Sequence, residues 1–174
     1  MDLGRKVALT VALAWLTSGC ATRPDGRTPT VLDHNRSVVM RVFDDILNRQ
    51  RYDLFDTLYA LDFVKHIDGH DETLAEEIVD AKSMYQMSTD LIITVDAIIA
   101  SGDLVATRYT GRGTHNGHFG ALPPSGRHFE LSGMTFYRLR DGRIIEEWTT
   151  YNESELLRQL GVGAAAGPGS PGSH

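Results

Sequence analysis

The fold of this chain depends most on residues 129–151, which read FELSGMTFYRLRDGRIIEEWTTY. Two long runs, 129–140 and 143–151, flank the pair Asp141-Gly142. Asp-Gly is favoured in two-residue hairpin turns because both turn residues need a positive φ. The stretch therefore predicts two long antiparallel strands that are joined by a tight turn.

A second hairpin precedes this one in the chain. Residues 91–100 and 104–112 are rich in β-branched side chains, and Ser101-Gly102-Asp103 separates them. A short strand is also expected over 62–66, running into a polar loop. Together these segments predict a meander of long antiparallel strands in the second half of the chain.

Helical patterns dominate the first half. Apolar residues at three- and four-residue spacing over 38–47 predict an amphipathic helix, and a short helix is expected over 53–60. Thr73 and Glu76 form a capping box for a third helix, and a last helix begins at Asn152 and ends at Gly161. Helices followed by antiparallel strands indicate an α+β fold.

The bulk composition suits one globular domain. The chain has 174 residues, of which 41% are hydrophobic, and a formal net charge of −6. A nucleic-acid partner would require a basic stripe, and Lys and Arg are scattered instead. We therefore expect no nucleic-acid binding.

The first 33 residues resemble the leader and tether of a bacterial lipoprotein. Arg5 and Lys6 precede an apolar run over 7–16, and residues 16–20 read LTSGC, similar to the box in which the cysteine is acylated. The alternative is an ordinary signal peptide with an incidental Cys20. The expected division is a signal peptide over 1–19, a lipidated tether over 20–33, a domain over 34–161 and a disordered tail over 162–174. Such a protein would sit at the cell envelope, attached to the membrane through its lipid alone.

An ordered series of motifs resembles one known family. The motifs are DFVKH at 62–66, GTHNGHF at 113–119, PSGR at 124–127, FYRLRDGRIIEEW at 136–148 and QLG at 159–161. The series resembles the SnoaL-like polyketide cyclase, or ester cyclase, family of the nuclear-transport-factor-2-like (NTF2-like) superfamily. This resemblance implies an NTF2-like cone, in which a strongly curved antiparallel sheet and helices enclose a deep, mostly apolar pocket.

The resemblance also implies a chemistry. The family's characterised cyclases close a ring by intramolecular aldol condensation, use no metal or organic cofactor, and rely on an acidic side chain with a histidine nearby. We expect a small hydrophobic carbonyl compound as the ligand and no cofactor. Two alternatives stay open, namely a non-catalytic envelope protein that binds a small hydrophobic molecule and an epoxide hydrolase-like enzyme. Whether two domains pair through the outer face of the sheet is also open.

Strand alternation places the main catalytic candidates on one face. Glu146, Trp148 and Asn152 share a face of the last strand. The family places this tryptophan inside the cavity, where the charged form of a carboxylate is disfavoured and acid–base work is favoured. Alternatively, Glu146 pairs with Arg108. Asn152 stands where the family commonly has an aspartate base, and asparagine cannot accept a proton; it fits a helix N-cap.

Histidines and one arginine complete the candidate site. His66 could move a proton at the cavity mouth, or it could be a hydrogen-bonded histidine at a strand end. His115, His118, Trp148 and Arg108 are candidate substrate-binding residues. The histidines, with His70, lack a recognised metal-ligand spacing, so we predict no metal site.

The lipid anchor is directly testable. Replacing Cys20 with serine should abolish labelling by a fatty-acid probe and move the protein out of the membrane fraction, because Cys20 is the only thiol that could carry the lipid. A serine variant that stays membrane-bound with its labelling unchanged would contradict the anchor.

Overall fold

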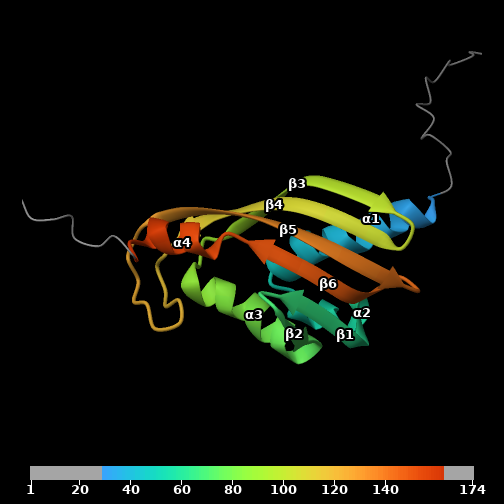
Figure 1. Ribbon diagram of the computed structural model, residues 1–174, viewed down its shortest axis with the longest axis horizontal. Coiled ribbons are helices and arrows are strands. Elements are labelled where there is room, and N and C mark those ends of the chain that lie inside the picture. Colours follow the sequence, from blue (N-terminus) through green and yellow to red (C-terminus); the bar gives the residue numbers. More distant parts are fainter. Residues whose placement is uncertain (1–28, 163–174) are drawn as a thin grey trace, which may run out of the picture.

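The computed structural model of the protein describes residues 29–162. Within this range, helices pack against one bent, six-stranded sheet (Figure 1). The helical elements are α1 (Val31–Arg41), the π-helix η1 (Val42–Leu47), the 3-10 helix η2 (Tyr52–Leu54), α2 (Phe55–Leu58), α3 (Leu74–Met87) and α4 (Glu153–Leu160). The strands are β1 (Tyr59–Ile67), β2 (His70–Thr73), β3 (Ile92–Ser101), β4 (Leu104–Thr114), β5 (His128–Arg140) and β6 (Arg143–Tyr151). The fold is α+β, as expected.

The sheet is open, with the strand order β2-β1-β6-β5-β4-β3. Strands β3 to β6 form the expected antiparallel meander, whereas β1 pairs with β6 in parallel. Strand β2 lies where the sequence indicated only a polar loop. Its residues are mostly exposed, so they show no apolar alternation that could reveal a strand. The sheet is therefore mixed rather than wholly antiparallel.

The first helix begins earlier than the sequence indicated. Thr30 and Asp33 form a capping box, so α1 starts at Val31, inside the segment 20–33 that the sequence predicts as tether. The helix continues without a break into η1, whose Val42, Phe43 and Ile46 are buried. The residues before 29, including Cys20, lie outside the described range. No helix within residues 29–162 is long and apolar enough to span a membrane.

Strand β6 contains a β-bulge near its start. Leu139 of β5 pairs with Ile144, but Arg138 pairs with Glu146, so Ile145 is an extra residue without a partner on β5. A bulge of this kind reverses the alternation of the residues that follow it. Ile144 is fully buried, and after the bulge Glu147 rather than Glu146 faces the same side as Ile144.

The loop over 115–127 is attached to the end of α3. Gly117 donates its backbone N–H to the carbonyl of Met87 at 2.9 Å, and a Cβ on Gly117 would collide with the carbonyl of Gln86. Only glycine permits this close approach. The attachment places Phe119 of the loop against the interior of the domain.

The tight turn at Asp141-Gly142 is confirmed, with φ of 52° and 76°. We expect Gly142→Val to lower the free energy of unfolding by about 1 kcal/mol or more, since a β-branched residue resists positive φ. The new side chain would also press on His34, whose Nε2 lies 2.9 Å from the position that a Cβ on residue 142 would take.

Gly142→Asn is the matched control, because asparagine tolerates this backbone region. Chemical denaturation should show a smaller loss for asparagine than for valine. Equal stability of the valine variant and the natural protein would contradict the turn.

Candidate active site

A cavity of about 340 Å³ lies between the sheet and the helices. Its walls are mostly apolar and rich in aromatic rings. The aromatic residues lining it include Phe43, Tyr59, Tyr109, Phe129 and Tyr137. Gly133 makes room for one of them, because a Cβ at that position would overlap the Tyr109 ring. The domain thus encloses the deep, mostly apolar pocket that the sequence predicted.

Strand β6 gives the cavity its polar wall. Glu147, Thr149 and Tyr151 line the cavity, and Glu147 is only 6% exposed. Oε1 of Glu147 accepts a hydrogen bond from the Thr149 hydroxyl at 2.6 Å. The Thr149 hydroxyl lies 2.8 Å from that of Thr135, which also lines the cavity. These contacts fix the carboxyl group in position from one side.

The other oxygen of Glu147 has no hydrogen-bond partner. Oε2 is buried and contacts no donor or acceptor among the described residues. Burial raises the pKa of Glu147 to about 8, and the nearby charge of Glu77 adds to the rise, whereas the hydrogen bond from Thr149 opposes it. A carboxyl group with such a pKa exchanges its proton close to neutral pH, as a general acid or base must.

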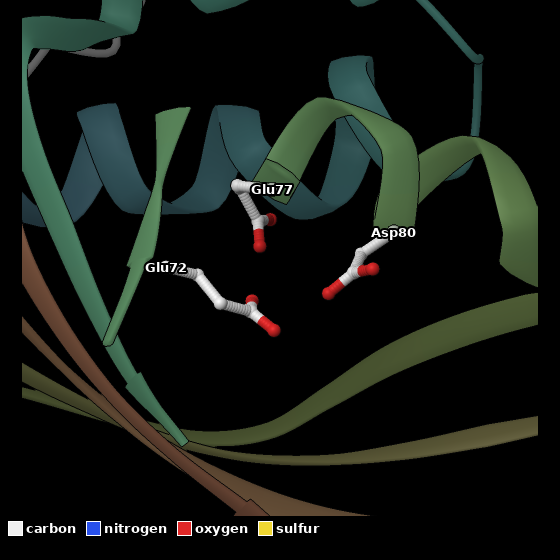
Figure 2. Close-up of side chains that lie close together, drawn as sticks. All are labelled: Glu72, Glu77 and Asp80. Atoms are coloured by element: carbon white, nitrogen blue, oxygen red, sulfur yellow. The ribbon is translucent and has the colours of Figure 1, made fainter. Parts of the chain in front are cut away.

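A group of ion pairs, here called the Lys65 cluster, lies beside the cavity, and three of its four members line it. Its members are Lys65 of β1, Glu72 of β2, and Glu77 and Asp80 of α3. Figure 2 shows the three carboxylates pointing toward one another. The Lys65 ammonium binds all three, at 2.5 Å from Glu72 and 2.8 Å from both Glu77 and Asp80.

The three carboxylates of the Lys65 cluster have the spacing of a metal site, with one oxygen from each lying within 4.8 Å of the others. The cation that they surround is the ammonium of Lys65. Burial alone would lower the pKa of Lys65, but the carboxylates, Glu77 first, outweigh it and raise that pKa. The lysine therefore stays charged and acts as the structural counter-ion.

The predicted residues Glu146, Trp148 and His66 meet on the opposite, outer face of the sheet. His66 Nε2 lies 3.0 Å from Glu146 Oε1, and its ring stacks on Trp148 at 5.3 Å between centroids. Arg138 binds Glu146 Oε2 at 3.0 Å. Hydrogen bonds to Glu146 and then to Asp71 raise the pKa of His66. Met134 and Phe136 of the neighbouring strand β5 are also exposed, and nothing in the structure tests whether two copies pair through this face.

The predicted inward orientation of Glu146 and Trp148 is therefore wrong. Neither residue is among those that line the cavity, and Glu147 occupies the expected place. The physical reason is the bulge at Ile145, which moves the residues after it by one position relative to β5. The available signal was the apolar pair Ile144-Ile145, which is compatible with a bulge but does not locate one.

The other predicted residues lie apart from the cavity lining. Arg108 is exposed and pairs with Asp96 at 3.5 Å. The expected pair of Arg108 with Glu146 is therefore absent, and Glu146 pairs with Arg138. His118 is exposed in the loop over 115–127. His115 is 1% exposed, and its Nδ1 lies 3.0 Å from the hydroxyl of Ser125. A buried histidine bound in this way fixes the loop.

Asn152 caps a helix, which agrees with its interpretation as an N-cap and not with a role as the base. Its side-chain oxygen accepts the backbone N–H of Glu155 at 3.0 Å, and the residue is exposed. The sequence also pairs Asn152 with Glu155 as a capping box, but the Glu155 carboxylate binds Arg158 instead. The family's usual aspartate position thus carries a structural amide here.

Comparison of the sequence with known families identifies the protein's relatives. A sequence model of the SnoaL-like polyketide cyclases matches residues 37–160, which is more than half of the chain. The chain belongs to the SnoaL-like polyketide cyclase family. No curated protein sequence matches it significantly.

Solved structures agree with this assignment. IdmH of Streptomyces antibioticus, a proposed polyketide cyclase, is 31% identical over 74% of this chain and 99% of its own, with a TM-score of 0.66. AclR of Streptomyces galilaeus, a proposed hydroxylase, is 24% identical over 75% and 82%, with a TM-score of 0.69. A proposed SnoaL-like polyketide cyclase of Jannaschia sp. CCS1 is 20% identical over 78% and 97%, also with a TM-score of 0.69. The last two likenesses support the NTF2-like fold alone.

The raised pKa of Glu147 makes stability depend on pH. The folded state holds the proton up to about pH 8, whereas the unfolded state releases it near 4.5. Stability should therefore fall as the pH rises through this window. In thermal melts, Glu147→Gln should flatten this fall, because the amide has no proton to lose.

Glu130→Gln, at an exposed surface ion pair with Arg112, should leave the fall as steep as in the natural protein. Equal slopes for the Glu147→Gln variant and the natural protein would show that Glu147 titrates normally.

Proposed function

We propose that this SnoaL-like protein is an enzyme that performs acid–base chemistry on a small, neutral carbonyl compound, with Glu147 as the base. The observation that carries the proposal is the buried Glu147 carboxyl group, which lines an aromatic cavity and whose Oε2 has no hydrogen-bond partner among residues 29–162. A pKa of about 8 leaves about one molecule in ten ionised at pH 7, which is enough for a general base.

The proposed reaction is a ring closure of the aldol type. Ionised Glu147 removes a proton from the carbon next to a carbonyl group, and the electron pair of the broken C–H bond forms an enolate. The enolate carbon attacks a second carbonyl carbon of the same molecule, and a C–C bond forms while the C=O π bond opens to an alkoxide. Protonated Glu147 returns its proton to the alkoxide, so no cofactor or co-reactant is consumed.

The contacts of Glu147 fit this role. Oε1 accepts the Thr149 hydroxyl and Oε2 has no partner among the described residues, so we assign the proton exchange to Oε2. The Lys65 cluster does not neutralise Glu147, because the ammonium of Lys65 already binds three other carboxylates. Without a bound cation the carboxyl group keeps its high pKa, which makes it a strong base when ionised.

A binding protein without catalysis is the second candidate. The observation in its favour is Asn152, an exposed helix cap at the position where the family commonly has its aspartate base. In this alternative the protonated Glu147 would only donate a hydrogen bond to the ligand. The epoxide hydrolase alternative calls for a pair of carboxylates that flank Arg108. It loses support, because Arg108 is exposed and pairs with one carboxylate, that of Asp96, among the described residues.

We also propose that the protein works at the cell envelope, attached through Cys20. The support is the sequence pattern of residues 1–20, because Cys20 lies outside the described residues. A substrate at the cell envelope would come from outside the cell or be exported from the cytoplasm.

Adjacent glutamates offer a matched test of the base. With a substrate found by screening cyclic and linear diketones, Glu147→Gln should lower kcat by about a hundredfold or more, the usual effect of losing a general base. The rate of the natural protein should rise with pH and level off above about 8. Glu146→Gln should retain nearly full activity.

Loss of activity in Glu146→Gln with retention in Glu147→Gln would move the site to the outer face and to His66. Tight binding of diketones by the natural protein without turnover at any pH would favour the binding protein.

A further inference from the structure

We propose that the phenol of Tyr59 holds the carbonyl oxygen of the substrate, and that the substrate is therefore a neutral ketone or ester. This inference rests on the proposed function, because it names the substrate class and a second polar contact for the same cavity. It is tested by binding, which does not require that Glu147 be the base.

Tyr59 is a buried polar group that the fold leaves unsatisfied. It is the first residue of β1, is 1% exposed and lines the cavity. Its hydroxyl has no hydrogen-bond partner within residues 29–162. Native proteins rarely leave buried hydroxyls unpaired, so an unpaired one at a cavity wall indicates where a ligand atom binds.

The neighbouring phenols are not equivalent to that of Tyr59. Tyr109 and Tyr137 also line the cavity, but both interact with the side chain of Thr135. Tyr85 has an unpaired buried hydroxyl too, yet it is not among the residues that line the cavity. Tyr59 thus combines the two properties that a ligand contact needs, an unused hydroxyl and a place in the wall.

The hydroxyl of Tyr59 acts as a donor. Burial, and then the nearby charge of Glu147, raise the pKa of Tyr59 well above 10, so the phenol keeps its proton at any physiological pH. The Tyr59 ring packs against Phe55 and Phe63, whose side chains offer no hydrogen-bond acceptor. A ligand oxygen that accepts a hydrogen bond, such as a carbonyl oxygen, is the natural partner.

The charge of the cavity wall excludes an anionic ligand. The Lys65 cluster holds one ammonium and three carboxylates, and Glu147 adds a further acidic group. A carboxylate ligand would meet this excess of negative charge, and the one cation among the described lining residues, Lys65, is already paired. A neutral acceptor meets no such penalty.

The cavity has room for a small ring compound. Its volume of about 340 Å³ lies within the range of small-molecule pockets, which run from about 300 to 1,000 Å³. A two-ring ketone fits within this space. Tyr59 and Glu147 come from the neighbouring strands β1 and β6, so one small molecule can lie between them.

The test uses 1-tetralone, a two-ring ketone, and the infrared band of its carbonyl group. Bound to the natural protein, the band should shift to lower wavenumber, as hydrogen bonding requires. Tyr59→Phe keeps the ring and removes the hydroxyl, so it should abolish the shift and weaken binding about five- to tenfold. Tyr85→Phe is the matched control and should change neither quantity.

Failure to bind 1-tetralone, or a band that is the same in Tyr59→Phe and the natural protein, would overturn the inference. If Tyr59→Phe does not fold, 3-fluorotyrosine at position 59 replaces it. This more acidic phenol should shift the band further, and an unchanged band would overturn the inference.

The variant Glu147→Gln separates the two proposals. It should keep the carbonyl shift that depends on Tyr59 while losing turnover. Turnover that survives in Glu147→Gln would remove the proposed base and leave the Tyr59 contact standing. A band shift that Tyr59→Phe does not alter would remove the Tyr59 contact and leave the base standing.

Discussion

The bulge at Ile145 determines which side chains of β6 face the interior. Without the extra residue, the buried Ile144 would be followed on the inner face by Glu146 and Trp148. With it, Glu147 and Thr149 enter the cavity, while Trp148 stacks on His66 outside. A carboxyl group in the cavity and an ion-paired cluster on the outer face both follow from one inserted residue. Bulges often lie beside active sites because they redirect a side chain in this way.

The buried carboxyl groups of this domain lie in two different environments. The acids of the Lys65 cluster share an ammonium, and the short contacts of Lys65 with Glu72 and Glu77 offset the cost of removing these charges from water. Glu147 receives no cation, only the Thr149 hydroxyl, so its proton is retained to about pH 8. The first arrangement ties β1 and β2 to α3. The second leaves a proton available in the cavity, and the proposed chemistry needs that proton.

The fold could be predicted from sequence because its signals are local. The Asp141-Gly142 turn and the Thr73 capping box depend on neighbouring residues, and both form as expected. Strand β2 and the parallel pairing of β1 with β6 depend on contacts between distant segments, which no local pattern encodes. The candidate site was missed for a different reason. Alternation sorts the residues of β6 after the bulge into two faces correctly, but the inner face was assigned from the family's tryptophan, and here Trp148 stacks on His66 on the outer face while Glu147 lines the cavity.

The position of Glu147 explains how an asparagine can stand at residue 152. In this chain Asn152 is exposed and its oxygen caps α4, so an acid there would serve the helix as well as an amide does. Glu147 lies on the cavity side of β6, where a carboxyl group reaches a bound molecule. If the proposed base is correct, the acid has moved from the end of the strand to its middle while the fold and the cavity stayed the same. The base would then be identified by its position in the cavity wall and not by its position in the motif. Family membership alone therefore does not identify the base.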